Sequence, residues 1–333
     1  MKFLSTKILA ASLISAVTAT CVVGQVANFD SLNGYAAGVE TRIVSNRETL
    51  VHLQNLNTLS GLTLSGQYID RTIKATADRI ERDTNGRSGT LGYGWNLGTW
   101  GLGIRLTADT TTSKYTEVRS PAPVPLHGVV DADTLAGQLW VGGNFGSWHV
   151  NFALGAGKTD HDGTRISDIG SSRASFDSTD KSVQFQVSYE HATTGKMAIR
   201  SMAGISNINA QADGFTETGT SPDRRIVRDF KARETMGLLG LQLAAKEGDW
   251  IPSVTVAWLH EFSENDTRIT NSAINGANLG SGLVPNTAGD LFYANVRLDG
   301  RMSKDWVLSS ELQYVKGGSE KQWGFQLGIK RLF

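Results

Sequence analysis

The chain has 333 residues with 32 basic and 32 acidic side chains, so its formal net charge is zero. This balance excludes the basic surface expected of a nucleic-acid-binding protein. A single cysteine excludes a disulfide framework and a cysteine metal cluster. The sequence contains no apolar run long enough for a transmembrane helix, and its 37 glycines and 6 prolines suit sheets with tight turns.

Residues 1–24 have the features of a secretory signal peptide. A positively charged start precedes an apolar stretch over residues 8–17, and small residues at Ala19 and Gly24 offer two cleavage sites. The lone cysteine, Cys21, follows a poor lipobox, so we expect export without lipid attachment.

Residues 25–61 form an N-terminal arm that does not follow a strand pattern. Apolar residues recur in it at near-helical spacing, with charged residues between them, which predicts an amphipathic helix over Arg47–Leu59. A loose arm is the alternative that the pattern leaves open.

From residue 62 onward, apolar residues alternate with glycine and polar residues, which predicts strands. The first strand is expected over Thr63–Arg82, and Asn85-Gly86 predicts a hairpin turn after it. The following strands are expected at Gly89–Leu97, Trp100–Thr112, Leu135–Phe145, Trp148–Lys158, Val183–His191, Met197–Asn209, Ala232–Lys246, Trp250–Phe262, Leu291–Met302 and Trp306–Lys316. The last strand, Lys321–Phe333, has one apolar face and ends on an aromatic residue.

The lengths of the connections alternate along the chain. Tight turns are expected at Gly98-Thr99, Gly146-Ser147, Thr194-Gly195, Gly248-Asp249 and Lys304-Asp305. Longer polar connections are expected at Ser113–Asp131, Thr159–Thr179, Gln211–Ile226 and Glu264–Gly289. Short turns at one end and long loops at the other are typical of bacterial outer-membrane barrels. The sequence therefore predicts an all-β fold over residues 62–333, an antiparallel transmembrane β-barrel of about twelve strands.

Tryptophans mark one end of these strands. Trp100, Trp148, Trp250 and Trp306 each follow a tight turn directly, which accounts for half of the 8 tryptophans. Amphipathic rings belong where lipid headgroups meet the apolar band, so these residues predict a periplasmic aromatic girdle.

Charged residues lie on the opposite strand face. They are Arg105, Asp109, Glu190, Arg200, Glu234, Glu261, Arg297 and Glu311. A dry core would not tolerate them, whereas in a water-filled or helix-plugged lumen they can pair with one another and with solvent. His260 falls on the lipid side by strict alternation, which places it at the outer interface unless a bulge shifts the register.

The sequence predicts no catalytic, cofactor-binding or metal site. Gly155–Thr159 looks like the end of a phosphate-binding loop, but its first glycine is replaced by Phe152 inside a strand. His260-Glu261 lacks the second histidine of a zinc-protease helix, and no Gly-x-Ser-x-Gly elbow occurs. Asp160, His161 and Asp162 are expected on a solvated extracellular loop.

Three segments resemble the translocator β-barrel domain of type V autotransporters: Asp213–Gly219, Ala257–Phe262 and the aromatic C-terminal strand. The resemblance covers roughly residues 62–333. It implies a twelve-stranded barrel with an N-terminal helix threading the lumen. It also implies an assembly signal read by the barrel-assembly machinery, carried here by Phe325, Leu327, Ile329 and Phe333. Arg331 departs from the family pattern, which usually has an aromatic or apolar residue there.

These features predict an outer-membrane protein of a Gram-negative bacterium that resembles a translocator domain. Only residues 25–46 lie between the signal peptide and the predicted helix, too few for an independent passenger domain. We expect a monomeric, non-enzymatic barrel without cofactor, whose partners are outer-membrane lipid, the Sec export pathway and the barrel-assembly machinery, and not nucleic acid. A porin-like diffusion channel or a structural outer-membrane protein is the alternative. The sequence leaves open whether the pore is plugged and whether a surface ligand exists.

Overall fold

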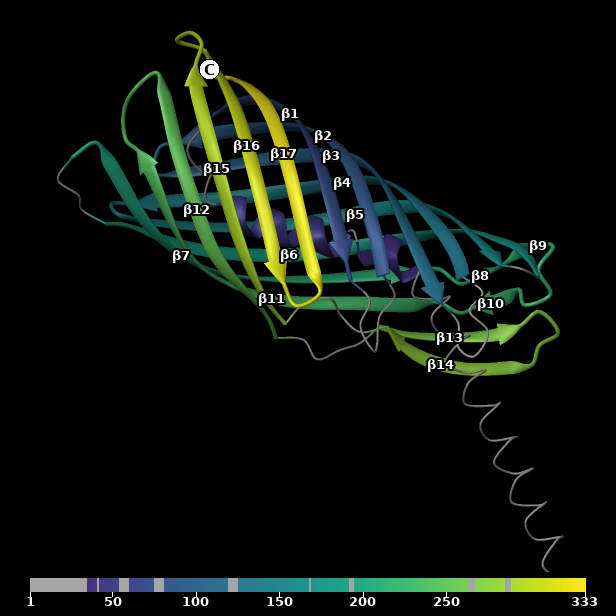
Figure 1. The fold of residues 1–333 in the computed structure, drawn as a ribbon. Coiled ribbons are helices and arrows are strands. Elements are labelled where there is room, and N and C mark those ends of the chain that lie inside the picture. Colours follow the sequence, from purple (N-terminus) through teal and green to yellow (C-terminus); the bar gives the residue numbers. More distant parts are fainter. Residues whose placement is uncertain are drawn as a thin grey trace, which may run out of the picture.

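The computed structural model describes residues 35–40, 42–53, 60–74, 81–118, 125–167, 169–191, 195–262, 267–284 and 289–333. Twelve of the thirteen strands in its main sheet form a closed ring (Figure 1). The ring runs through β1 (Gly61–Ile73), β2 (Glu81–Leu97), β3 (Trp100–Val118), β4 (Pro125–Phe145), β5 (Trp148–Ser167), β6 (Gly170–His191), β7 (Met197–Ala212), β11 (Phe230–Ala245), β12 (Trp250–Glu261), β15 (Asp290–Arg301), β16 (Trp306–Gly317) and β17 (Glu320–Arg331). All neighbouring pairs are antiparallel, and β1 pairs with β17, so the predicted twelve-stranded barrel is confirmed.

The two faces of the sheet have inverted polarity compared with a soluble protein. On the outer face Leu139 is 58 % exposed, and the exposed hydrophobic side chains there include many leucine, valine, isoleucine, phenylalanine and tryptophan residues. On the inner face Gln186 is fully buried. An apolar outer surface around a polar interior is the arrangement that a barrel needs when lipid surrounds it.

The two ends of the barrel differ. One end, here called the turn end, carries the short connections after β2, β4, β6, β11 and β15 together with the C-terminus. The other end, called the loop end, carries the connections after β1, β3, β5, β7, β12 and β16. The predicted short turns lie at the turn end, but their segregation is incomplete, because the connections after β5 and β16 at the loop end are also short.

Several predicted loops are largely strand. β3 extends to Val118 and β4 begins at Pro125, so most of Ser113–Asp131 continues the sheet, and β5 and β6 likewise take up most of Thr159–Thr179. The outer face of these extensions is polar, so their sequence lacks the apolar alternation that predicts a strand. Their inner face is buried by Tyr115, Val130 and other residues that pack inside the barrel.

The first hairpin was misplaced. β1 ends at Ile73 and β2 begins at Glu81, so the predicted strand Thr63–Arg82 spans parts of two strands. Asn85 and Gly86 lie within β2 and are not a turn. Asn85 accepts a hydrogen bond from the Tyr68 hydroxyl at 2.9 Å, and a Cβ at Gly86 would clash with Ile69 at 2.8 Å. Cross-strand contacts therefore account for this pair of residues.

A helix lies inside the barrel (Figure 1). Residues 35–40 and 42–52 are α-helical and residue 53 forms a 3₁₀ turn. We call these residues the lumen helix. The prediction of Arg47–Leu59 was right in type but began too late, and residues 54–59 lie outside the described part of the chain. None of the described helices is long and apolar enough to cross a membrane.

The two long connections at the loop end contain strands of their own. They form a four-stranded sheet in the order β14 (Asn278–Val284), β13 (Thr267–Ala273), β10 (Arg225–Val227) and β8 (Phe215–Thr216). The two-residue strand β9 (Thr218–Gly219) pairs with β6. The predicted loops Gln211–Ile226 and Glu264–Gly289 are thus partly ordered sheet, which lies at the loop end of the barrel in Figure 1.

Candidate functional site: the lumen and its helix

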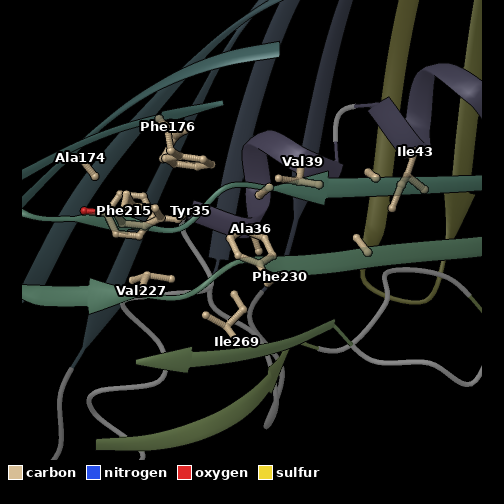
Figure 2. Close-up of a cluster of buried hydrophobic side chains, with 14 of the residues drawn as sticks. Tyr35, Ala36, Val39, Ile43, Ala174, Phe176, Phe215, Val227, Phe230 and Ile269 are labelled. Atoms are coloured by element: carbon tan, nitrogen blue, oxygen red, sulfur yellow. The ribbon is translucent and has the colours of Figure 1, made fainter. Parts of the chain in front are cut away.

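The first turn of the lumen helix packs into a buried apolar cluster at the loop end (Figure 2). The ring of Tyr35 meets that of Phe215 edge to face, with centroids 5.0 Å apart, and Phe176 stacks on Phe215 at 4.6 Å. Gly163 on β5 leaves room for the helix, because a Cβ there would lie 2.4 Å from the Tyr35 ring. Residues from the helix, the barrel wall and the small sheet therefore share one core.

A polar network lies beside this cluster. The Tyr35 hydroxyl donates a hydrogen bond to Glu217 at 2.6 Å, and Arg165 donates to Glu217 at 2.7 Å and to Asp223 at 2.8 Å. Burial alone would raise the pKa of Asp223, but hydrogen bonds from Arg165 and Ser221 hold that pKa below its ordinary value. The network ties the start of the helix to β5 and to the connection between β7 and β11.

Deeper in the lumen, buried ion pairs join the helix to several walls. Arg42 donates to Asp180 on β6 at 2.7 Å and lies 3.6 Å from Asp109 on β3. Glu40 accepts a hydrogen bond from Arg82 on β2. Low-dielectric surroundings make such pairs strong only when every charge has a partner, and each of these charges has one.

Arg47 connects the helix to two separate strands of the barrel wall, β11 and β17. Its guanidinium donates to Glu234 on β11 at 2.8 Å and lies 3.4 Å from Glu320 on β17. Glu320 also accepts two hydrogen bonds from Arg71 on β1, at 2.9 and 3.0 Å. Two carboxylates and two guanidinium groups thus form one buried chain across the lumen.

The last turns of the helix make amide and apolar contacts. Gln184 and Gln186 on β6 donate to the carbonyl oxygens of Asn46 and Leu50 at 2.8 and 3.0 Å. His52 lies 3.1 Å from both Glu311 on β16 and the Tyr293 hydroxyl on β15. Leu50 and Val51 join a buried cluster with Met202, Met236, Leu238, Ala257, Leu259, Leu291, Tyr293 and Val315.

The charges predicted for the lumen lie in three groups. Glu234, Glu311 and Asp109 contact the helix as described, and Arg105 donates to the Thr49 hydroxyl at 3.3 Å. Arg200 and Glu190 pair with each other at 2.9 Å, whereas Arg297 pairs with Asp299 at 2.9 Å. Glu261 lies half-buried at the end of β12.

Seven other charged residues that form these ion pairs were not identified from the sequence. They are Glu40, Arg42, Arg47, Arg71, Arg82, Asp180 and Glu320. Arg71 offered one signal, because it interrupts the predicted first strand whichever face is chosen. The helix residues offered none, because their charges are compatible with a solvated helix face.

The predicted girdle residues lie on the outer face at the turn end. Trp148 is 52 % exposed and its ring contacts that of Tyr189 at a centroid distance of 4.9 Å, and Trp100 contacts Phe145 at 5.2 Å. Trp250 and Trp306 are also exposed at the starts of β12 and β16.

Three of the predicted assembly-signal residues lie on the closing strand, and Phe333 lies two residues beyond its end. Phe325, Leu327, Ile329 and Phe333 are all exposed. Arg331, the departure from the family pattern, places its guanidinium 5.8 Å from the ring of Trp306 and 5.1 Å from that of Phe333. Cation–π contacts of this kind are favourable at an interface between lipid and water. Arg331 therefore packs among the aromatic residues at the turn end of the barrel.

The remaining candidates for chemistry have structural surroundings. His260 points outward in an uninterrupted register and lies 2.8 Å from Asp290. His161 lies in β5 and not on a loop, and it is buried with its ring stacked 4.5 Å from that of Phe176. In the part of the chain that the structure describes, no cluster of three or more histidine, cysteine or acidic residues is arranged to hold a metal ion.

The model of the autotransporter beta-domain family matches residues 62–313. The fold is similar to the translocator domain of the autotransporter NalP from Neisseria meningitidis, with a TM-score of 0.71, 13 % identity and coverage of 90 % of this chain and 98 % of that one. It is also similar to the transport unit of the autotransporter AIDA-I from Escherichia coli, with a TM-score of 0.63, 11 % identity and coverage of 92 % and 99 %. No curated protein sequence matches the chain.

Proposed function

We propose a function from one established premise: this chain belongs to the autotransporter beta-domain family. Domains of this family are β-barrels of the outer membrane of Gram-negative bacteria, and the chain is such a barrel. We infer that it is a translocator whose lumen helix joins the barrel to a segment displayed at the cell surface.

The direction of the helix carries this inference. Its first residue, Tyr35, lies at the loop end in the cluster with Phe215, and its last turn packs against β6 and β11 to β16 deeper in the barrel. Long loops of outer-membrane barrels face outward and short turns face the periplasm. The Tyr35 end of the lumen helix therefore faces the cell-surface side of the barrel.

The contacts of the lumen support a transport and anchoring role and not an enzymatic one. The described helix residues make ion pairs, amide hydrogen bonds and apolar contacts with the wall. These contacts hold a plug in place. We propose that the barrel has no catalytic residues of its own.

We further propose the route by which the barrel reaches the membrane. Residues 1–24 direct export through the Sec pathway, and the barrel-assembly machinery reads Phe325, Leu327 and Ile329 on β17 together with Phe333, two residues beyond the end of that strand. Their exposure on and just beyond the closing strand supports this role. Trp100, Trp148, Trp250 and Trp306 then anchor a monomeric barrel in lipid at the periplasmic interface.

Surface display tests the proposal. An epitope inserted between Asn28 and Phe29 should be labelled by antibody on intact cells. The matched control is the same epitope in the tight turn at Gly146-Ser147, which should be labelled only after permeabilisation. If the epitope ahead of the helix also requires permeabilisation while the barrel is folded, the proposed direction is wrong.

A further inference from the structure

The pair formed by β1 and β17 is the seam of the barrel. Other neighbours in the ring follow one another along the chain, whereas these two strands lie at opposite ends of the barrel sequence. Their twelve-residue register runs from Leu62 opposite Arg331 to Ile73 opposite Glu320. No turn tethers them, so closure brings together distant ends of the chain and carries the loop-closure entropy of the whole barrel. An unpaired edge in lipid would leave backbone groups unsatisfied.

Charged side chains cross this seam on its inner face. Arg71 on β1 donates two hydrogen bonds to Glu320 on β17, and both side chains are almost fully buried. The helix completes this pair, because Arg47 lies 3.4 Å from the same carboxylate. A bidentate Arg–carboxylate pair is among the strongest charge-assisted contacts, and here it joins the first strand to the last.

The next helix residue, Glu48, also contacts both strands of the seam. The Glu48 carboxylate accepts hydrogen bonds from Gln67 on β1 at 2.8 Å, from Gln313 on β16 at 2.8 Å and from Gln322 on β17. One helix side chain therefore gathers carboxamides from both strands of the seam and from the strand beside it.

The closing strand makes room for this arrangement. Gly324 on β17 lies opposite Gln313 on β16, and a Cβ at Gly324 would lie 2.4 Å from the Gln313 side-chain nitrogen. The missing side chain lets Gln313 lie across β17 and reach Glu48. This inner-face glycine has a packing reason that strand patterning does not explain.

We propose that the lumen helix seals the barrel at its seam. Arg47 and Glu48 form a clamp that holds β1 against β17 from inside, in addition to occupying the lumen. The inference concerns closure of the barrel, so it stands independently of any segment carried to the surface.

A covalent seam staple separates this role from general stabilisation by the helix. Ser65 and Gly328 are opposite each other across the seam, and a Cβ at Gly328 would lie 3.3 Å from that of Ser65, near the separation that a disulfide needs. The staple is the pair S65C and G328C in the full-length chain, with Cys21→Ser in every variant. Arg42→Ala is the matched control, because Arg42 binds β6 and β3 and not the seam.

The measurement is the rate at which heat in SDS converts the folded band to the unfolded band. Glu48→Ala should unfold about tenfold faster than the unstapled parent, since it loses three hydrogen bonds to the strands at the seam. The staple should restore most of this loss in Glu48→Ala but not in Arg42→Ala. Glu48→Gln, which keeps the side-chain volume, provides the comparison if Glu48→Ala does not fold. A parental unfolding rate in the Glu48 variants, or equal rescue of Arg42→Ala by the staple, would overturn the proposal.

Discussion

Arg47 places a positive charge in the lumen between two carboxylates. Its side chain is 4 % exposed, and those of Glu234 and Glu320 are each 1 % exposed. A charge removed from water in this way depends on its partners, because the desolvation of each group must be offset by the other. Glu320 has a second partner in Arg71, whereas Glu234 faces Arg47 in the contacts described.

Replacing one partner of this pair should lower the free energy of unfolding more than replacing both partners. We expect Arg47→Met to lower the free energy of unfolding by about 3–5 kcal/mol, because it leaves Glu234 buried without its partner. The double variant R47M/E234M should be considerably less destabilised, since both charges are gone and the volume is kept. Denaturant unfolding of the three proteins in detergent measures this difference. Equal stability of the single and double variants would contradict the role assigned to Glu234.

At the scale of elements, the lumen helix is held by its first turn as well as by its charges. Tyr35 enters a core shared by the barrel wall and the small sheet of the loop end (Figure 2). The wall leaves space for this ring only because Gly163 has no side chain. Close packing of this kind responds to a single added methyl group.

Gly163→Ala should therefore displace the Tyr35 ring and destabilise the protein by about 1–3 kcal/mol. The matched control is Gly137→Ala on the outer face of β4, where a Cβ would meet only Leu106 at an ordinary 3.6 Å. Limited proteolysis of the connection between β7 and β11 should detect the loosened cluster in Gly163→Ala alone. Similar cleavage of both variants would argue against a specific fit.

At the scale of the whole molecule, the helix divides the lumen. Its contacts with β6 and β11 to β16 are tight, whereas a cavity of about 780 Å³ remains in the lumen. Hydroxyl-bearing residues of β1 to β3 line it, including Thr63, Ser65, Thr90 and Thr107, and Arg105 lines it as well. The barrel interior is thus obstructed by the helix and incompletely filled.

This arrangement predicts the conductance of the purified protein. Deletion of residues 31–59 should raise the single-channel conductance in planar bilayers, because it removes the helix from the lumen. The unmodified protein should lack the large steady conductance of an open porin. A large conductance before deletion, or no change after it, would favour the porin-like alternative and count against the plug.

The sequence by itself determined the barrel, its strand number, the two unequal ends and the outward aromatic residues at the turn end. These features are written locally, because each strand must alternate apolar and polar side chains where lipid surrounds it. The same local signal failed in β3 to β6 beyond the apolar band, where the outer face is polar. It also failed at Asn85-Gly86, where cross-strand contacts replace a turn.

Only the tertiary structure decided that helical residues precede Arg47, as far back as Tyr35 among the described residues, and which charges meet. Glu48 and Gln322 are separated by 274 residues, and Arg47 and Glu234 by 187. Their spacing along the chain carries no information about their contact, because closure of the ring brings these strands around the helix. The sequence therefore identified the polar inner face, and the three-dimensional fold paired its residues and placed the helix across the seam.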